Sequence, residues 1–493
     1  MYTNEVSQKF EGSNLKEWEV NECYRMKGRK QKISNETETC PHQARTESDA
    51  YVGGQTFMWI TENNPTDIKT GHGLLEFIVS PANLNAAYKQ VKSNKGAAGV
   101  DHMEVDSLKD YLLDRKEELI TSILQGKYRP NPVRRVEIPK DNGSKRLLGI
   151  PTAIDRLIQQ AISQALTPLY EALFSPNSYG FRPGRNAHQA LLKSRDCITE
   201  GYTYAVDLDL EKFFDTVNHS RLVELLSRRI DDGRVVSLIH RYLNAGIRIG
   251  AHYEPGELGV PQGGPLSPLL SNVMLDELDK ELERRGHRFA RYADDVIVFC
   301  RSKRGAERVM DSLVPFIEQK LRLKVNREKS RVVPARSVKF LGYSFYRRKG
   351  LGRLRIHPQS VMKMKAKIKE LTCRGNGWGN ERRKEELRQY IIGWVHYFKL
   401  ADMSILLQKV DEWYRRRLRM VIWKQWKQIR TRMANLIKLG VKNSKAWEWA
   451  NTRKGYWYTA NSYILATSLT NDRLRQAGYI FLSDYYKKVH VKT

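Results

Sequence analysis

The chain contains 493 residues, enough for several domains at about 100 to 200 residues per domain. Its 85 Lys and Arg residues outnumber its 55 Asp and Glu residues, so the formal net charge of +30 excludes an acidic surface. Five scattered cysteines without a C-x-x-C pair exclude a zinc framework and a disulfide scaffold.

A positive charge of this size indicates a polyanionic partner, because each phosphate that a basic side chain neutralises releases condensed counterions. The alternative is a well-solvated basic surface of ribosomal type. No stretch reaches the roughly 18 consecutive apolar residues of a membrane span, and the N-terminus resembles neither a signal sequence nor a transit peptide. We therefore expect a soluble protein without a membrane partner, in the cytoplasm rather than in an organelle.

The first elements in chain order are an extension and a helix. Residues 1–70 contain seven Val, Ile or Leu residues, too few to offset chain entropy, and predict a mobile extension through residue 73. Apolar residues at helical spacing from Leu84 to Val91 then predict a helix that ends before a glycine-containing loop at residues 95–99.

A hairpin and a second helix follow. Alternation over residues 133–139 and 146–150, around a turn at residues 141–143, predicts two antiparallel strands. Apolar residues on one face of residues 155–170 predict a helix.

The segment from Tyr204 to Leu210 predicts a strand with two unlike faces. Val206, Leu208 and Leu210 project to one side, whereas Asp207 and Asp209 project to the other. The aliphatic side belongs in a core. The two carboxylates would need basic partners if their role were structural.

A second pair of strands is predicted at residues 289–292 and 296–300, with Asp294 and Asp295 at the tip of the hairpin. Residues 338–345 predict another strand. Beyond them the chain becomes helical and strongly basic to about residue 435.

Three of these aspartates have the character of a metal site. Transfer of a nucleotide to a 3′ hydroxyl uses two divalent ions about 3.5–4 Å apart, and magnesium prefers carboxylate oxygens supplemented by phosphates and water. Asp209, Asp294 and Asp295 offer such oxygens at strand ends. The alternative is ordinary, because most adjacent aspartates lie in solvated turns.

The surrounding motifs resemble one family over about residues 75–490, the group II intron reverse transcriptases/maturases. The blocks that carry the resemblance are Tyr-Ala-Asp-Asp at 292–295, Asp-Leu-Glu-Lys-Phe-Phe-Asp at 209–215, the glycine-containing loop at 94–101, the segments at 145–156, 179–185 and 260–268, and Gly-Trp-Val-His-Tyr-Phe at 393–398. The resemblance implies that Asp209, Asp294 and Asp295 are catalytic and bind two Mg²⁺ ions, with Mn²⁺ as a substitute. The backbone carbonyl of Leu210 is a further implied ligand, and Asp207 is implied to be a supporting acid.

The same resemblance implies a site for the incoming deoxynucleotide. Phe214 corresponds to the bulky residue that excludes a 2′ hydroxyl, and Phe213 is the alternative that faces the core. Lys140 and Arg146 would neutralise the triphosphate, unless they are exposed hairpin charges. Gln262 would pack against the nucleotide, unless it is an ordinary loop amide.

Further residues resemble the parts that hold RNA and primer. Lys329 corresponds to a later lysine of the palm, and Leu341 with Gly342 corresponds to the primer grip. A basic helix with Trp423 and Trp426 beside it could follow a phosphate backbone and stack on bases, or could be a solvated face. Its expected RNA contacts are Arg415, Arg416, Arg419, Lys424 and Lys427. By contrast, we interpret Leu387, Ile391, Trp394 and Phe398 as a core stripe.

The expected fold is an α+β right-hand polymerase, with fingers and a palm that carries an antiparallel catalytic sheet, followed by an all-α thumb/maturase region. The expected parts are a mobile N-terminal extension (1–73), mainly fingers (74–203), mainly palm (204–355), the thumb/maturase region (356–450) and a DNA-binding-like tail (451–493). Because no zinc-binding cysteines follow Cys373, an H-N-H endonuclease domain is not expected.

The expected function is RNA-directed DNA synthesis, combined with binding of the parent group II intron RNA to assist splicing and mobility. Its partners would be that RNA, an RNA template, a DNA primer or target, deoxynucleotides and a second copy of the chain. It would act in the bacterial cytosol and associate with the nucleoid during mobility. The alternatives are a splicing-only RNA-binding maturase, and a domesticated or defence-associated reverse transcriptase without an intron.

Overall fold

The structure is a computed structural model that describes residues 73–490, except 140–142, 144 and 251. The expected N-terminal extension and Lys140 therefore lie outside the described residues. Helices and strands mix as far as β10, and helices follow from α12 onward. This order confirms an α/β region followed by a helical region.

The first part of the described chain combines helices with the sheet β2-β1-β4-β5. The strands are β1 (Val133–Pro139), β2 (Lys145–Ile150), β4 (Ile247–Ile249) and β5 (His252–Glu254). The helices are α2 (Leu74–Ile78), α3 (Pro81–Ser93), α4 (Leu108–Leu124), α5 (Ala153–Glu171), α8 (His219–Ser227) and α9 (Gly233–Leu243). The β1–β2 hairpin and helices α3 and α5 confirm the sequence prediction.

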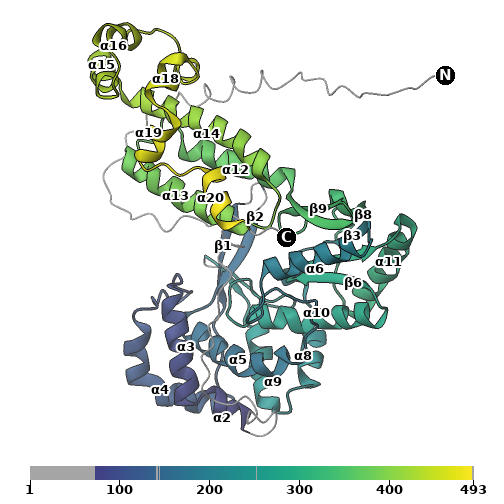
Figure 1. Ribbon diagram of the computed structural model, residues 1–493. Coiled ribbons are helices and arrows are strands. Elements are labelled where there is room, and N and C mark those ends of the chain that lie inside the picture. The colour runs from purple at the N-terminus through teal and green to yellow at the C-terminus, as the bar shows by residue number, and fades with distance from the viewer. Residues whose placement is uncertain (1–72, 140–142, 144, 251, 491–493) are drawn as a thin grey trace, which may run out of the picture. The chain divides into compact units, whose positions relative to one another are not determined.

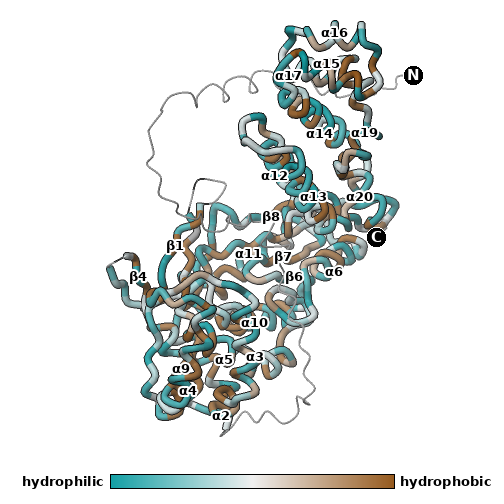
Figure 2. Tube along the Cα trace, turned by 90° about the vertical axis from the view of Figure 1, so that its left-hand side faces the viewer, coloured by the Kyte–Doolittle hydropathy of each residue, from teal (hydrophilic) through white to brown (hydrophobic). Residues whose placement is uncertain are grey.

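A second sheet, β6-β7-β3-β8, is antiparallel throughout. Its strands are β3 (Tyr204–Leu208), β6 (Arg288–Tyr292), β7 (Asp295–Cys300) and β8 (Arg331–Pro334), and the elements around it are α6 (Ala187–Thr199), α7 (Phe213–Thr216), α10 (Ser267–Arg284), α11 (Lys303–Pro315), the π-helix η2 (Phe316–Lys320) and the short 3-10 helix η3 (Ala335–Ser337). Figure 2 shows β6 and β7 between α11 and α6.

The alternation predicted for β3 is present, and it assigns the two faces of the sheet to two cores. Val206 and Leu208 belong to the core shared with α10 and α11, whereas Ala205 belongs to the core shared with α6 and the C-terminal helices. Regular strand pairing ends at Leu208, earlier than predicted, because Leu210 instead forms an isolated bridge with Val325. The carboxylates of Asp207 and Asp209 project from the same face as Ala205.

The predicted strand at residues 338–345 is wrong in its first half. The strand β9 (Tyr343–Arg348) pairs with β10 (Leu351–Ile356), and a tight turn precedes it. Phe340 and Tyr343 exchange backbone hydrogen bonds of 3.0 and 2.9 Å across Leu341 and Gly342. Both turn residues have positive φ, 50° and 80°, as a two-residue turn of this kind requires.

The C-terminal region is all helical, and Figure 1 shows α12, α13, α14 and α20 packed side by side. Its helices are α12 (Pro358–Leu371), α13 (Asn380–Tyr397), α14 (Ser404–Gln425), α15 (Ile429–Lys438), α16 (Asn443–Ala450), α17 (Tyr456–Thr459), α18 (Tyr463–Ser468), α19 (Asn471–Gln476) and α20 (Leu482–Val489). The predicted core stripe from Leu387 to Phe398 is confirmed as buried. The helices beyond residue 450 share its core.

The last helix is attached to α14 by one buried carboxylate. Asp411 accepts hydrogen bonds from the backbone amides of Leu482 (3.0 Å) and Ser483 (2.8 Å) and from the Ser483 hydroxyl (2.5 Å). These amides belong to the first turn of α20, which has no partner for them within the helix. Asp411 therefore caps a helix that lies about 70 residues further along the chain.

We predict that Asp411→Ala lowers the free energy of unfolding by about 3 kcal/mol, because three donors lose a charged acceptor in the core. Urea unfolding followed by tryptophan fluorescence measures the change. The control is Asp472→Ala, since Asp472 is exposed and pairs only at the surface with Arg475. That variant should change stability by about 0.5 kcal/mol or less. Equal midpoints for the two variants would contradict this role of Asp411.

Candidate active site

The strand register places two of the predicted aspartates side by side. Leu208 on β3 lies opposite Val296 on β7 in the last regular pair, and continuing that register by one residue places Asp209 opposite Asp295. Directly opposite residues of antiparallel strands have Cα atoms about 4.5–5.5 Å apart and project to the same side. Residues 86 positions apart in sequence thus meet at one edge of the sheet.

Asp294 lies in the turn that joins β6 to β7. Tyr292 pairs with Asp295, which leaves Ala293 and Asp294 as a two-residue connection. Ala293 has a φ of 56°, and the Gly180 backbone packs so closely on it that a Cβ at Gly180 would lie 2.2 Å from the Ala293 nitrogen. Only glycine at position 180 allows this approach, which fixes the turn from outside.

A fully buried ion pair holds the same turn from inside. Arg291 donates from Nε and Nη2 to Asp279 of α10 at 2.5–2.9 Å, and both side chains are completely buried. The remaining nitrogen, Nη1, donates to Asn272 (2.9 Å) and to the carbonyl oxygen of Ala293 (3.0 Å). Asn272 in turn donates to the carbonyl oxygen of Gly180 at 2.9 Å. The guanidinium therefore connects α10 to the turn that carries Asp294.

The sequence prediction missed Arg291, Asp279 and Asn272, although a signal was present for the first two. Arg291 lies on the same side of β6 as Phe289, which is buried, so strand alternation directs a cation into the core. A buried cation requires an acid beside it. Burial raises the pKa of Asp279, and the adjacent guanidinium opposes that rise.

Asp209 is fixed by the loop before β8. Its backbone amide donates to the Ser330 hydroxyl (3.0 Å), and its carbonyl oxygen accepts from the Asn326 amide (2.9 Å). Its carboxylate lies 3.5 Å from the ammonium group of Lys329. The structure thus brings Lys329, predicted from sequence, to the candidate catalytic aspartate.

Asp207 has the basic partner that a carboxylate inside a sheet requires. Arg331 of β8 lies 3.5 Å from it, although the pairing was not predicted. Burial raises the pKa of Asp207, the charge of Arg331 lowers it, and the rise prevails.

Three carboxylates at one sheet edge do not by themselves make a closed metal site. Among the residues that the structure describes, no group of three His, Cys, Asp or Glu side chains could hold a metal ion on its own. The donor set still fits magnesium, because magnesium is usually held by one or two carboxylates together with substrate phosphates and water. The backbone of Leu210, the other implied ligand, forms the bridge with Val325.

Two of the predicted nucleotide residues, Phe214 and Gln262, meet at one loop. The Val260 amide donates to the Phe214 carbonyl oxygen at 2.6 Å, and the Gly149 amide of β2 donates to the Gln262 carbonyl oxygen at 2.8 Å. Phe213 is buried and faces the core, whereas Phe214, the residue expected under the sugar, is only partly buried. Arg146 lies on β2, the strand that contains Gly149.

The turn at Leu341 and Gly342 is held by a buried tyrosine of α13. The Tyr397 hydroxyl donates to the Leu341 carbonyl oxygen at 3.0 Å. Burial raises the pKa of Tyr397, and the nearby Asp295 adds to the rise. The sequence prediction missed Tyr397, although it lies within the Gly-Trp-Val-His-Tyr-Phe block.

The predicted RNA contacts on the basic helix are largely engaged within the protein. Donors on α14 reach backbone carbonyl oxygens of other segments: Arg416 to Trp457, Arg419 to Leu469, and Lys424 to Arg374. The guanidinium of Arg415 lies 5.6 Å from the Phe481 ring centre. Lys427 lies beyond the end of α14 and is exposed.

Two expectations about this region are wrong. The basic segment is not one helix, because α14 ends at Gln425 and α15 begins at Ile429. Trp423 is only 1% exposed and packs against Trp426, so its ring is not available for stacking on bases. The apolar face of α14 needs this ring for its core, which spacing within the helix did not reveal.

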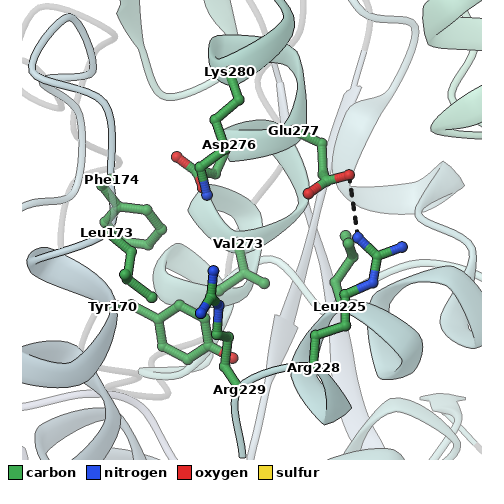
Figure 3. Close-up of a pocket in the computed structure, with 10 residues that line it drawn as sticks. All are labelled: Tyr170, Leu173, Phe174, Leu225, Arg228, Arg229, Val273, Asp276, Glu277 and Lys280. Carbon is green, nitrogen blue, oxygen red and sulfur yellow. Dashed lines mark ion pairs between the residues drawn. The ribbon is translucent and has the colours of Figure 1, made fainter.

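An open pocket of about 220 Å³ lies elsewhere, between α5, α8 and α10. Figure 3 shows Tyr170, Arg229 and Val273 around it, with an ion pair between Arg228 and Glu277 at one side. None of the candidate catalytic aspartates lines this pocket. We therefore assign the chemistry to the edge of the sheet and not to this pocket.

Across the part of the chain that the structure describes, every helix is too short or too polar to cross a bilayer.

Comparison with known proteins identifies two regions of the chain. Residues 138–345 match the family described as reverse transcriptase (RNA-dependent DNA polymerase), and residues 361–440 match the maturase-specific domain of group II introns. The first region contains all three candidate aspartates, and the second spans α12 to α15.

Similar curated proteins include Protein YkfC of Escherichia coli K12, which is 33% identical over 326 residues, 57% of this chain and 85% of that protein. The group II intron-encoded protein LtrA of Lactococcus lactis subsp. cremoris is 29% identical over 408 residues, 69% of this chain and 65% of LtrA.

Among solved structures, a chain of a partial Cas6-RT-Cas1–Cas2 complex is 26% identical with a TM-score of 0.33, and the match covers 50% of this chain and 43% of that one. The two sequence families carry the assignment. The chain belongs to the group II intron reverse transcriptase/maturase family, whose members are RNA-directed DNA polymerases that also assist the splicing and mobility of their introns.

Proposed function

We propose that this chain extends a primer on an RNA template, with Asp209, Asp294 and Asp295 as the ligands of two magnesium ions. The observation that supports the proposal is the end of the β3–β7 register: Leu208 lies opposite Val296, Asp209 directly follows Leu208, Asp295 directly precedes Val296, and Asp294 lies in the adjoining turn. Magnesium, or manganese in its place, would activate the 3′ hydroxyl and steady the leaving pyrophosphate. Lys329 would release Asp209 when a metal ion neutralises that carboxylate.

The incoming deoxynucleotide would lie between the hairpin β1–β2 and the loop at residues 260–264. The hydrogen bond from Gly149 to Gln262 joins these two segments, and the bond from Val260 to Phe214 places the aromatic residue at the same loop. Phe214 would lie under the sugar and exclude a 2′ hydroxyl. Arg146 and Lys140 would neutralise the triphosphate. The turn at Leu341 and Gly342 would hold the primer end.

In this proposal the chain is a right-hand polymerase, with the fingers mainly in residues 74–203, the palm mainly in 204–355, the thumb/maturase region in 356–450 and a DNA-binding-like tail in 451–493. The parent group II intron RNA would bind the basic helical region. Lys427 and Arg430 are exposed there, whereas Arg416, Arg419 and Lys424 would have to exchange carbonyl partners for phosphates. Because its nucleotides and RNA are found there, the protein would act in the cytoplasm.

Arg291 would be a positioning residue for the reaction. It touches neither the metal ions nor the substrate in this proposal, but its bond to the Ala293 carbonyl oxygen fixes the turn that presents Asp294. A small displacement of a catalytic group can reduce the rate about 100-fold.

The proposed activity predicts that Asp294→Ala abolishes complementary DNA synthesis, because the turn loses a metal ligand. Primer extension on an RNA template with magnesium and deoxynucleotides measures it. Asp311→Ala, which removes an exposed carboxylate on α11, is the control and should extend like the wild type. If the wild-type protein were inert and splicing survived in both Asp294 and Asp311 variants, a splicing-only maturase would be the better assignment.

Phe214→Ala should admit ribonucleotides, because it removes the bulk expected under the sugar. The ratio of kcat/KM for a deoxynucleotide to that for the matching ribonucleotide should fall about 10-fold to 100-fold, a loss of about 1.4–2.7 kcal/mol of discrimination. Phe214→Tyr keeps the ring and should keep the ratio. An unchanged ratio in Phe214→Ala would remove this residue from sugar selection.

Arg291→Lys should lower kcat about 100-fold while KM for the deoxynucleotide changes little, because lysine keeps the charge but loses the fork that joins Asp279 to Ala293. The matched control is Arg383→Lys, at another buried arginine, whose donors reach Asn376 and Trp378. Urea unfolding of both variants separates lost stability from lost positioning. A kcat within twofold of the wild type would contradict the role of Arg291.

A further inference from the structure

The hairpin β9–β10 carries a concentration of positive charge that the proposed polymerase reaction does not use. Residues 347–355 contain five basic residues and no acidic residue. These residues are Arg347, Arg348, Lys349, Arg353 and Arg355. All except Arg353, which is partly buried, are exposed.

The register of the hairpin separates an inner face from an outer face. Phe345 lies opposite Leu354, and both side chains are fully buried in the core shared with α6. The alternate positions form the outer face, where Tyr346 lies opposite Arg353 and Arg348 lies opposite Leu351. Strand alternation thus buries the inner face in the core and leaves the outer face available to contact a partner.

This outer face forms one wall of a groove of about 580 Å³, and the first turn of α14 forms the other wall. The cations that line the groove are Arg348, Lys349 and Arg353, against one acid, Asp402, which lies 3.7 Å from Arg353. The groove therefore carries a net positive charge. Its apolar surface is unusually accessible, since Ile405 is 72% and Leu351 is 53% exposed.

The groove lies away from the candidate catalytic aspartates. Gly352 near the tip of the hairpin donates its amide to Thr199, which precedes the first residue of β3, whereas Asp209 follows the last residue of β3. Five residues of strand separate Tyr343 from Arg348, a length of about 17 Å. A ligand in the groove would therefore not occupy the place of the reacting primer end.

We propose that this groove binds the phosphodiester backbone of a folded RNA, at a second site separate from the template–primer site. The inference rests on the proposed function, which supplies RNA as a partner. Arg348, Lys349 and Arg353 contact phosphates, and the exposed faces of Ile405 and Leu351 pack against ribose or an unpaired base. Charge complementarity favours RNA, because a polyanion gains counterion release from each cation along the hairpin.

The test uses the full chain with its catalytic site filled by an RNA template, a dideoxy-terminated primer and the next deoxynucleotide. A fluorescently labelled 24-nucleotide RNA stem–loop is then titrated at several salt concentrations. The variant is Arg348→Gln, Lys349→Gln and Arg353→Gln together, which removes the three charges but keeps polar side chains. We expect at least 10-fold weaker binding of the stem–loop and a salt slope that falls by about two units.

The control removes the same charge elsewhere, with Lys303→Gln, Arg304→Gln and Arg308→Gln on α11, and should bind the stem–loop like the wild type. Primer extension by both triple variants should remain within about twofold of the wild type. If the hairpin variant bound the stem–loop with unchanged affinity and salt slope, the groove would not be an RNA site. If its primer extension fell in parallel with binding, the groove would belong to the template–primer path and the second site would not exist. An inactive wild type would instead overturn the proposed polymerase.

Discussion

The ion pair between Arg291 and Asp279 is the constraint on which the candidate active site depends. Two fully buried charges are unfavourable unless geometry and hydrogen bonding compensate for lost hydration, and here the hydrogen bonds of the guanidinium to Asp279, Asn272 and the Ala293 carbonyl oxygen do so. The pair joins α10 to the turn between β6 and β7, while Gly180 closes the turn from the other side. The conformation of the turn that contains Asp294 is therefore determined by contacts in the core and not by solvent.

Much of the sheet could be predicted from the alternation of apolar and polar residues along each strand. When one face of a strand is aliphatic, that face must lie in the core. The two faces of β3, the hairpin with Asp294 and Asp295 at its tip and the β1–β2 pair all follow from that rule. The adjacency of Asp209 and Asp295 was expected from resemblance alone, since pairing partners far apart in the sequence leave no local pattern. Arg331 beside Asp207 and Asn272 beside Arg291 were missed for the same reason.

The errors lie where a local pattern allowed two structures. Leu341 and Gly342 follow Val338, Lys339 and Phe340, whose alternation is typical of a strand, yet both adopt positive φ, because the chain reverses direction between Phe340 and Tyr343. On α14, the positive charge suggested an exposed surface that follows a phosphate backbone. Instead, Arg416 and Arg419 donate to backbone carbonyl oxygens of the helices that follow α14. The position of neighbouring helix ends therefore predicts the partner of a basic residue better than its charge does.

The cap that Asp411 provides for α20 also has a consequence for biosynthesis. The acceptor lies in α14 and its donors lie near residue 482, so a ribosome exposes the acceptor long before the donors emerge. Until then the apolar faces of α13 and α14 lack the helix that completes their core. Nascent chains of this protein should therefore depend on chaperones late in translation, during an interval when a basic, partly folded surface is held close to ribosomal RNA.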